Sequence, residues 1–93
     1  MEQHEPLQDD IFLHCFQDEY GRLIMRASFV VDGLLENPGY GDDLAAVTEW
    51  DTVTGQLTRY EFRASGFLHK EDGPAVVAES GVEYHIEGVE RQP

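Results

Sequence analysis

The most reactive side chains in this sequence are a single cysteine, Cys15, and four histidines. Thiol catalysis needs a base within hydrogen-bond reach of the sulfur. His14 is next to Cys15 in the sequence, but consecutive residues of a strand point to opposite faces, so the two cannot form such a pair. We therefore expect Cys15 to be a small buried hydrophobe and the histidines to lie in turns or at the surface. The protein is predicted not to be an enzyme.

Metal binding is the second chemistry that these residue types could support. His69, Asp72 and His85 fall in a stretch where neighbouring hairpin strands could bring them together. No H-x-x-x-H or C-x-x-C spacing accompanies them, and one cysteine cannot build a Cys-rich zinc site. The segment Gly39-Tyr40-Gly41 lacks the following helix and basic residue of a phosphate-binding loop. The sequence therefore predicts no metal and no cofactor.

Net charge is the strongest functional signal in the chain. Nineteen Asp and Glu residues against six Lys and Arg give a formal charge of -13 over 93 residues. This charge opposes approach to DNA or RNA, so direct nucleic-acid binding is disfavoured and a basic partner is favoured. Alternate carboxylates along a strand lie about 6.6 Å apart, close to the spacing of successive backbone phosphates, so an acidic sheet could imitate a nucleic acid. The alternative is that the charge serves solubility alone.

The residues predicted to contact a protein partner are carboxylates on two hairpins and two aromatic anchors. The carboxylates would steer the encounter towards Lys and Arg clusters, and the aromatic side chains would supply contact area. The first hairpin contributes Asp42, Asp43, Glu49 and Asp51, the last contributes Glu79, Glu83, Glu87 and Glu90, and the aromatic anchors are Tyr40 and Trp50.

The elements that must position these groups are short strands separated by turns. Apolar or alternating runs predict strands over 11–16, 22–31, 44–51, 56–64, 75–78 and 82–87. A helix competes for 22–31, because its apolar residues do not strictly alternate. We predict an all-β fold, an antiparallel β-meander of about six short strands built from successive hairpins, with room for one short helix. In the last strand we expect one inward and one outward face, formed by Val82, Tyr84 and Ile86 and by Glu83, His85 and Glu87 respectively.

The length of 93 residues allows one domain with a thin core. Residues 1–10 carry four acids and no Lys or Arg, which predicts a flexible acidic N-terminal tail ahead of a single antiparallel β domain over 11–93. The lone cysteine excludes an internal disulfide. Because the chain also lacks a secretory signal and an apolar run of membrane-spanning length, we predict a cytoplasmic protein with no membrane contact.

A degenerate repeat relates residues 33–64 to residues 65–91. Its second copy contains the run His69-Lys70-Glu71-Asp72-Gly73-Pro74-Ala75, followed by a strand, a glycine turn and an aromatic-bearing strand. This run resembles the H-[KR]-E-D-G-P-A hairpin repeats, similar in style to MORN arrays, of small bacterial and phage proteins. The first copy lacks the His-Lys-Glu and Gly-Pro core. The resemblance implies a hairpin scaffold with interaction roles and brings no catalytic residues.

Size, charge and this resemblance together predict a non-enzymatic acidic binding protein. The leading hypothesis is an inhibitor of anti-CRISPR or anti-restriction type, encoded by a phage or mobile element, that blocks a basic protein or ribonucleoprotein of host defence in the host cytoplasm. The alternative is an assembly or immunity/antitoxin module that pairs a sheet edge with a toxin or with a second copy of itself, as a homodimer. Charge-led binding should weaken in high salt, whereas edge pairing should survive it.

Overall fold

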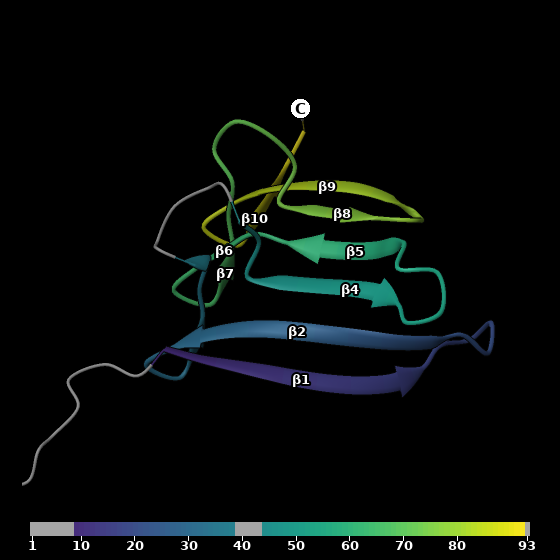
Figure 1. Ribbon diagram of the computed structural model, residues 1–93. Helices are drawn as coiled ribbons and strands as arrows, with labels where there is room; N and C mark the ends of the chain where they lie inside the picture. Colours follow the sequence, from purple (N-terminus) through teal and green to yellow (C-terminus); the bar gives the residue numbers. More distant parts are fainter. Residues whose placement is uncertain (1–8, 39–43, 93) are drawn as a thin grey trace, which may run out of the picture.

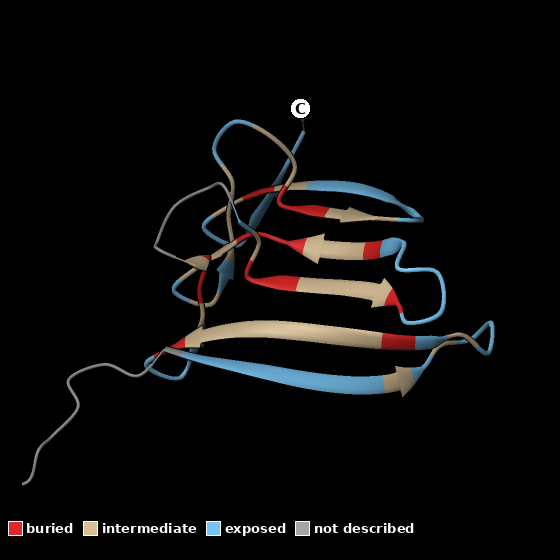
Figure 2. Cartoon of the chain, viewed as in Figure 1, coloured by how far each residue is buried: buried red, intermediate tan, exposed pale blue. Residues whose placement is uncertain are grey.

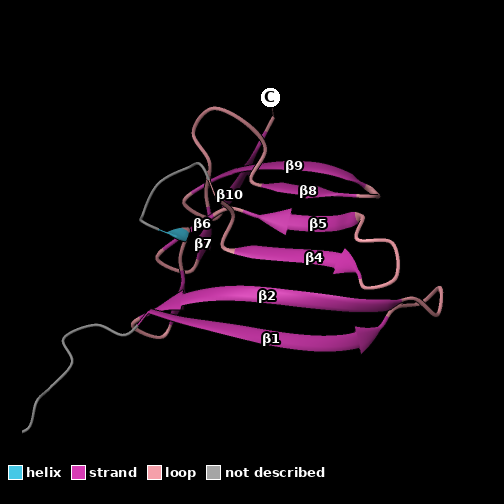
Figure 3. Ribbon diagram, viewed as in Figure 1, coloured by secondary structure: helices cyan, strands magenta, loops and turns pink. Residues whose placement is uncertain are grey.

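The computed structural model describes residues 9–38 and 44–92, which form ten β-strands (Figure 1). Apart from a 3₁₀ turn at Pro38, the described residues are strands, turns and loops (Figure 3). The strands are β1 (Asp9–Gln17), β2 (Leu23–Val31), β3 (Leu34–Leu35), β4 (Val47–Asp51), β5 (Leu57–Glu61), β6 (Arg63–Ala64), β7 (Phe67–Leu68), β8 (Val76–Ala78), β9 (Gly81–Ile86) and β10 (Val89–Arg91).

Eight of these strands form one antiparallel sheet in the order β1-β2-β4-β5-β8-β9-β10, with β3 also paired to β2. The strands β6 and β7 form a separate two-stranded hairpin, which lies at one end of the main-sheet strands in Figure 1. The predicted all-β antiparallel meander is confirmed, and residues 23–31 form a strand rather than the competing helix. Of the expected tail, Asp9 and Asp10 instead belong to β1, and residues 1–8 lie outside the described ranges.

The described residues form ten strands where six were expected. The short strands of the hairpins were not recognised in the sequence, and the run 56–64 divides into two strands at Phe62. The Phe62 N–H donates to the Ala75 carbonyl at 2.7 Å, and the Phe62 carbonyl accepts from the His69 N–H at 3.0 Å. The chain therefore leaves the main sheet after Glu61 and enters the small hairpin of β6 and β7.

Three hairpins reverse through the same two-residue geometry. Asp32-Gly33, Ser65-Gly66 and Glu87-Gly88 each have positive φ at both positions, with values of 54° and 84°, 49° and 86°, and 50° and 83°. Paired positive φ angles define the type I′ turn, whose twist matches that of the flanking strands. The sequence places glycine at the second position of each turn, where the left-handed region is least costly.

Two of these turns receive equivalent side-chain hydrogen bonds. The Ser65 N–H donates to Glu36 Oε1 at 2.7 Å, and the Glu87 N–H donates to His69 Nδ1 at 2.9 Å. The following glycines also match, since the N–H groups of Gly66 and Gly88 donate to the carbonyls of the Leu residues that precede these two side chains, both at 2.8 Å. His69 of the H-K-E-D-G-P-A run therefore makes a structural contact that holds the last turn.

The two faces of the main sheet differ in chemistry. Residues directly opposite one another on paired strands share a face, so the strand register assigns each side chain. We call the first the charged face; it includes Phe12, His14, Phe16, Ile24, Arg26, Ser28, Val47, Glu49, Asp51, Arg59, Glu61, Val76, Ala78 and Glu83. We call the second the apolar face; its central part includes Ile11, Leu13, Cys15, Met25, Ala27, Phe29, Thr48, Trp50, Leu57, Tyr60, Val77 and Val82.

The largest fully buried side chains lie on the charged face. Ile24, Val47 and Val76 are the largest fully buried side chains, and the carboxylate-bearing Glu61 beside them is only 2% exposed. Figure 2 shows this burial in the middle strands, whereas β1 is exposed along most of its length. The buried core is therefore small, and it lies on the face that carries the ion pairs.

Three expectations about side-chain placement are wrong. Cys15 is exposed, because it lies on β1 at the margin of the apolar face. His85 of β9 is 8% exposed rather than at the surface, and Val82 of the same strand is 50% exposed rather than inward. His85 is buried because the charged face is the more enclosed side of the sheet there, although Glu83 on the same face remains exposed.

The turns allow a matched stability test with Gly33→Ala and Gly88→Ala. Both substitutions put a Cβ at a φ above 80°, but the new Cβ has open space at Gly33 and lies 3.0 Å from Phe67 Cδ1 at Gly88. We expect Gly33→Ala to lower the free energy of unfolding by about 1 kcal/mol through backbone strain and Gly88→Ala to lower it by more. Urea unfolding followed by circular dichroism measures both, and equal losses would contradict the proposed contact with Phe67.

Candidate functional site

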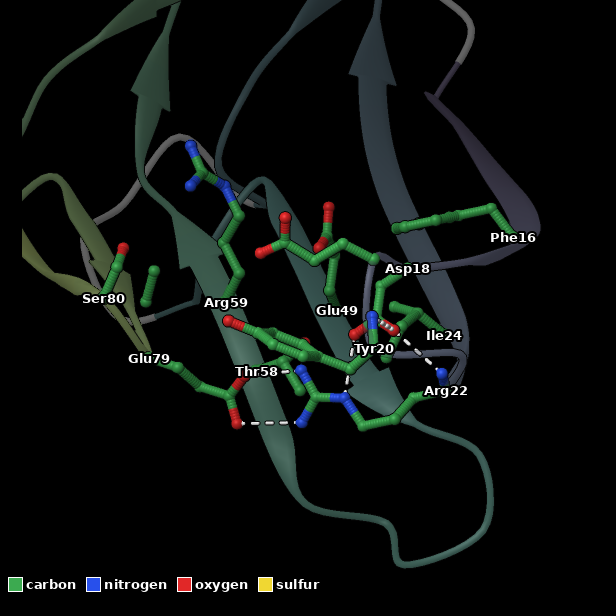
Figure 4. Close-up of a pocket in the computed structure, with 12 residues that line it drawn as sticks. Phe16, Asp18, Tyr20, Arg22, Ile24, Glu49, Thr58, Arg59, Glu79 and Ser80 are labelled. Atoms are coloured by element: carbon green, nitrogen blue, oxygen red, sulfur yellow. Dashed lines mark hydrogen bonds and ion pairs between the residues drawn. The ribbon is translucent and has the colours of Figure 1, made fainter.

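The charged face is hollowed near the β1–β2 turn, and the hollow has a volume of about 520 Å³ (Figure 4). Arg22 is one of the residues that line it. Its guanidinium donates to Glu79 through Nη1 at 3.1 Å and Nη2 at 2.7 Å, and to Asp18 Oδ2 through Nε at 2.8 Å. Because β4 and β5 lie between β2 and β8, this bidentate ion pair bridges the width of the hollow. The hollow is thus bounded by a clamp between two distant turns.

These contacts shift the pKa values of Arg22, Glu79 and Asp18 so that each group favours its charged form. The hydrogen bonds that Glu79 accepts from Arg22 lower the pKa of the Glu79 carboxyl and raise the pKa of the Arg22 guanidinium. Desolvation works to raise the pKa of Asp18, but hydrogen bonds from the Arg22 backbone and side chain outweigh it and hold that pKa low. All three groups stay charged across the neutral range, so none is poised to exchange a proton there.

Glu61 is the second charged centre of this face. It accepts hydrogen bonds from Arg59 Nε at 2.8 Å and from Arg63 Nε and Nη2 at 3.0 and 2.8 Å. Burial acts to raise the pKa of Glu61, yet the hydrogen bonds from Arg63 and Arg59 overcome that effect and lower it. A buried carboxylate is tolerated here because two guanidinium groups saturate its oxygens.

The arrangement supports structure more clearly than reaction chemistry. The described residues contain no group of three or more His, Cys, Asp and Glu side chains placed to hold a metal ion. His14 pairs with Arg26 on the charged face and Cys15 with Met25 on the apolar face, so the cysteine and its neighbouring histidine are separated by the sheet. Of the charged groups around the hollow, Asp18, Arg22 and Glu79 are paired with one another.

Four of the predicted contact carboxylates engage groups within the chain. Glu49 pairs with Arg26 at 3.5 Å, Glu79 pairs with Arg22, and Glu83 Oε1 lies 3.0 Å from His85 Nε2. Asp51 is buried and accepts hydrogen bonds from the N–H groups of Val53 at 2.8 Å and Thr54 at 3.3 Å, which shapes the β4–β5 turn.

The other predicted contact residues divide between exposed positions and segments that are not described. Glu87 and Glu90 are exposed at the β9–β10 hairpin, and Glu87 lies in its turn rather than in a row with Glu83. Trp50 lies on the apolar face between Met25 and Leu57, on the side opposite the charged side chains. Tyr40, Asp42 and Asp43 lie outside the described residues.

The apolar face is the surface that sequence reasoning missed. None of the twelve side chains named for it is buried, and none is acidic or basic. At its margins the same register adds the buried Val31 and, opposite Tyr84, Arg91 of β10. The one signal in the sequence was the run 75–78, which is apolar at every position and therefore suited to a strand whose second face meets a partner. The rest of the surface became visible only through strand register, because its members come from six different strands.

The outer edge of β1 is the second surface with a clear physical character. The Asp18 N–H donates to the Arg22 carbonyl at 3.0 Å across the β1–β2 ladder. Hydrogen-bonded positions alternate in an antiparallel pair, so Phe12, His14 and Phe16 bond to β2. Ile11, Leu13 and Cys15 therefore direct their N–H and C=O groups to the open edge, since β1 ends the sheet order.

Comparison with known protein families, with characterised proteins and with solved structures found no match for this chain. Within the residues that the structure describes, no helix is long and apolar enough to cross a membrane. The functional argument therefore depends on the surfaces of the sheet themselves.

The contribution of the buried carboxylate can be tested with Glu61→Gln. At pH 7 we expect this change to lower the free energy of unfolding by about 2 kcal/mol, because it leaves Arg59 and Arg63 facing a neutral group. The pKa of Glu61 is lowered from its ordinary value of 4.5 in the folded chain. The stabilisation is therefore present above pH 4.5 and is lost as the pH falls through the folded pKa.

Chemical unfolding at neutral pH and at about pH 3 measures this difference, with the exposed Glu90→Gln as the control. The gap between wild type and Glu61→Gln should narrow at the lower pH, while Glu90→Gln should match the wild type at both. A gap that stays constant with pH would show that the carboxylate charge contributes nothing to stability.

Proposed function

We propose that this protein is a non-enzymatic protein-binding module that takes a strand of its partner along the open edge of β1. The observation that supports the proposal is the backbone of β1, in which the groups of Ile11, Leu13 and Cys15 that point outward have no pairing strand among the described residues. Strand addition at such an edge supplies main-chain hydrogen bonds for affinity and side-chain pockets for specificity.

The chemistry of this edge favours pairing. The residues from Ile11 to Gln17 include no Asp, Glu, Lys, Arg or Pro. Ile11, Phe12 and Leu13 are all more than half exposed. Natural sheets usually protect long edges with charges, proline, bulges or covering segments. β1 runs for nine residues in continuous register with β2. From Ile11 to Gln17 it has no charge, proline or bulge, and no described strand pairs with its outer edge.

The edge proposal predicts different effects of Leu13→Pro and Leu13→Ala. Proline removes an N–H that faces the open edge, so it costs no hydrogen bond to β2 while blocking the added strand. Alanine shortens the same side chain and keeps the N–H. Tagged chains incubated with bacterial lysate and washed at about 1 M salt, where charges are screened within about 3 Å, should retain a partner with wild type and Leu13→Ala but not with Leu13→Pro.

Circular dichroism of Leu13→Pro provides the control for folding in this experiment. A folded Leu13→Pro chain that retains the same partner as the wild type would exclude pairing along this edge. If Leu13→Pro fails to fold, Cys15→Pro removes another outward N–H and repeats the comparison with Cys15→Ala as its control.

A second candidate function is the acidic inhibitor of anti-CRISPR or anti-restriction type, from a phage or mobile element, acting on a basic protein or ribonucleoprotein in the host cytoplasm. One observation favours it. Four of the six basic side chains, those of Arg22, Arg26, Arg59 and Arg63, pair with carboxylates on the charged face. Exposed acids at the turns and the last hairpin, including Asp32, Glu71, Glu87 and Glu90, therefore dominate the outer charge.

This candidate makes a prediction that salt can separate from edge pairing. The double change Glu87→Lys and Glu90→Lys should weaken capture of a basic partner at low salt, because charge steering depends on long-range attraction. Wild-type capture should itself fall at moderate salt, whereas strand pairing should persist. Binding assays against a captured nuclease or RNA-guided complex at stepped salt provide the measurement, and unchanged binding by the double variant would exclude a role for this acidic hairpin.

A further inference from the structure

The apolar face forms two continuous rows across the main sheet. One row joins Leu13, Ala27, Thr48, Tyr60, Val77 and Val82 through six neighbouring strands. The other joins Cys15, Met25, Trp50 and Leu57. Monomeric proteins seldom leave a contiguous apolar surface of this kind open, and such surfaces usually mark an interaction site.

Within the residues that the structure describes, all ten strands belong to the main sheet or to the side hairpin of β6 and β7. A second layer is nevertheless the usual way in which the apolar side of a sheet is satisfied.

Charge decides what kind of surface can meet this face. The rows contain no acidic or basic side chain, so a partner that brought charges against them would leave those charges without solvent or counter-ions. The same face of a second copy meets the requirement. Its carboxylates lie on the opposite side of its sheet, so stacking the two apolar faces points the charged faces, with Glu49, Glu61 and Glu83, away from the interface.

We propose that two copies of this chain pack their apolar faces together as a two-layer β-sandwich. Aligned sheets pack about 10 Å apart with interdigitating side chains, and Trp50, Tyr60 and Met25 supply the bulk for such a layer. The inference goes beyond the edge proposal and does not depend on it, because the dimer uses the face of the sheet and leaves the outward backbone of β1 available.

The apolar face is small, which limits the expected strength of association. Its six strands are separated by five spacings of about 4.8 Å, so the face is about 24 Å wide. Association also costs translational and rotational freedom, and we expect a dissociation constant on the order of micromolar. The dimer should therefore form and dissociate within an accessible concentration range.

Sedimentation equilibrium from about 0.1 to about 500 μM tests the proposal, in reducing buffer so that Cys15 cannot cross-link the copies. A matched pair of substitutions is Val82→Glu and Val53→Glu. Val82 is 50% exposed on the apolar face, whereas Val53 is 86% exposed in the β4–β5 turn. We expect wild type and Val53→Glu to dimerise equally and Val82→Glu to raise the dissociation constant at least tenfold.

Two probes already present in the chain report which surface is buried. Trp50 is the only tryptophan, so its emission should shift to shorter wavelength as the wild type dimerises. Cys15 is exposed on the same face, so its alkylation by a maleimide should slow at the same concentrations. Neither change should occur in Val82→Glu over this range.

Two results would overturn the sandwich. One is a wild-type chain that stays monomeric at all concentrations with Trp50 emission and Cys15 alkylation unchanged. The other is a dimer that survives Val82→Glu but is lost in Leu13→Pro, which would show edge pairing instead. If Val82→Glu fails to fold, Leu57→Glu replaces it, since Leu57 is 53% exposed on the same face. Edge pairing is tested by partner capture with Leu13→Pro, whereas the sandwich is tested by self-association of the wild type and Val82→Glu. Either proposal can therefore fail while the other stands.

Discussion

In a single-layer sheet each side chain points to one of two faces. This structure depends on a constraint: the charged side chains of the central strands must share one face and leave the other uncharged. The arginines and carboxylates of β2, β4 and β5 all point to one face. There Glu61 can be buried because Arg59 and Arg63 saturate it, and Arg22 can clamp Glu79 across the hollow. The opposite face of β2, β4, β5 and β8 carries no charged side chain, and this uncharged surface is the main candidate for an interaction site.

Local turn chemistry holds the frame in which this separation is maintained. Type I′ turns at Asp32-Gly33, Ser65-Gly66 and Glu87-Gly88 set the register of the flanking strands, and a side chain from an adjacent loop caps two of them. A slip of one residue in any main strand would move its charges onto the apolar face. The loop histidine of the H-K-E-D-G-P-A run is thus best understood through the hydrogen bond that it accepts in the last turn.

Much of the fold could be predicted from the sequence, but little of the candidate site could. The strands over 11–16 and 22–31 and the hairpin glycines were recognisable because strand-length apolar runs and turn residues are local signals. The division of the run 56–64 was not, because it depends on a hydrogen bond between Phe62 and the distant Ala75. The predicted carboxylates were chosen by charge alone, and ion pairs with Arg22, Arg26 and His85 depend on contacts that no local pattern reveals.

The sequence by itself determined an all-β chain with strong negative charge, one cysteine and glycine-punctuated hairpins. Those properties follow from composition and from periodicity within a few residues. Only the tertiary structure decided which side chains share a face, that His85 is buried, that Cys15 is exposed and that β1 ends the sheet. The physical reason is that the register between strands, and not the order of residues within one strand, places side chains from six strands into a common surface.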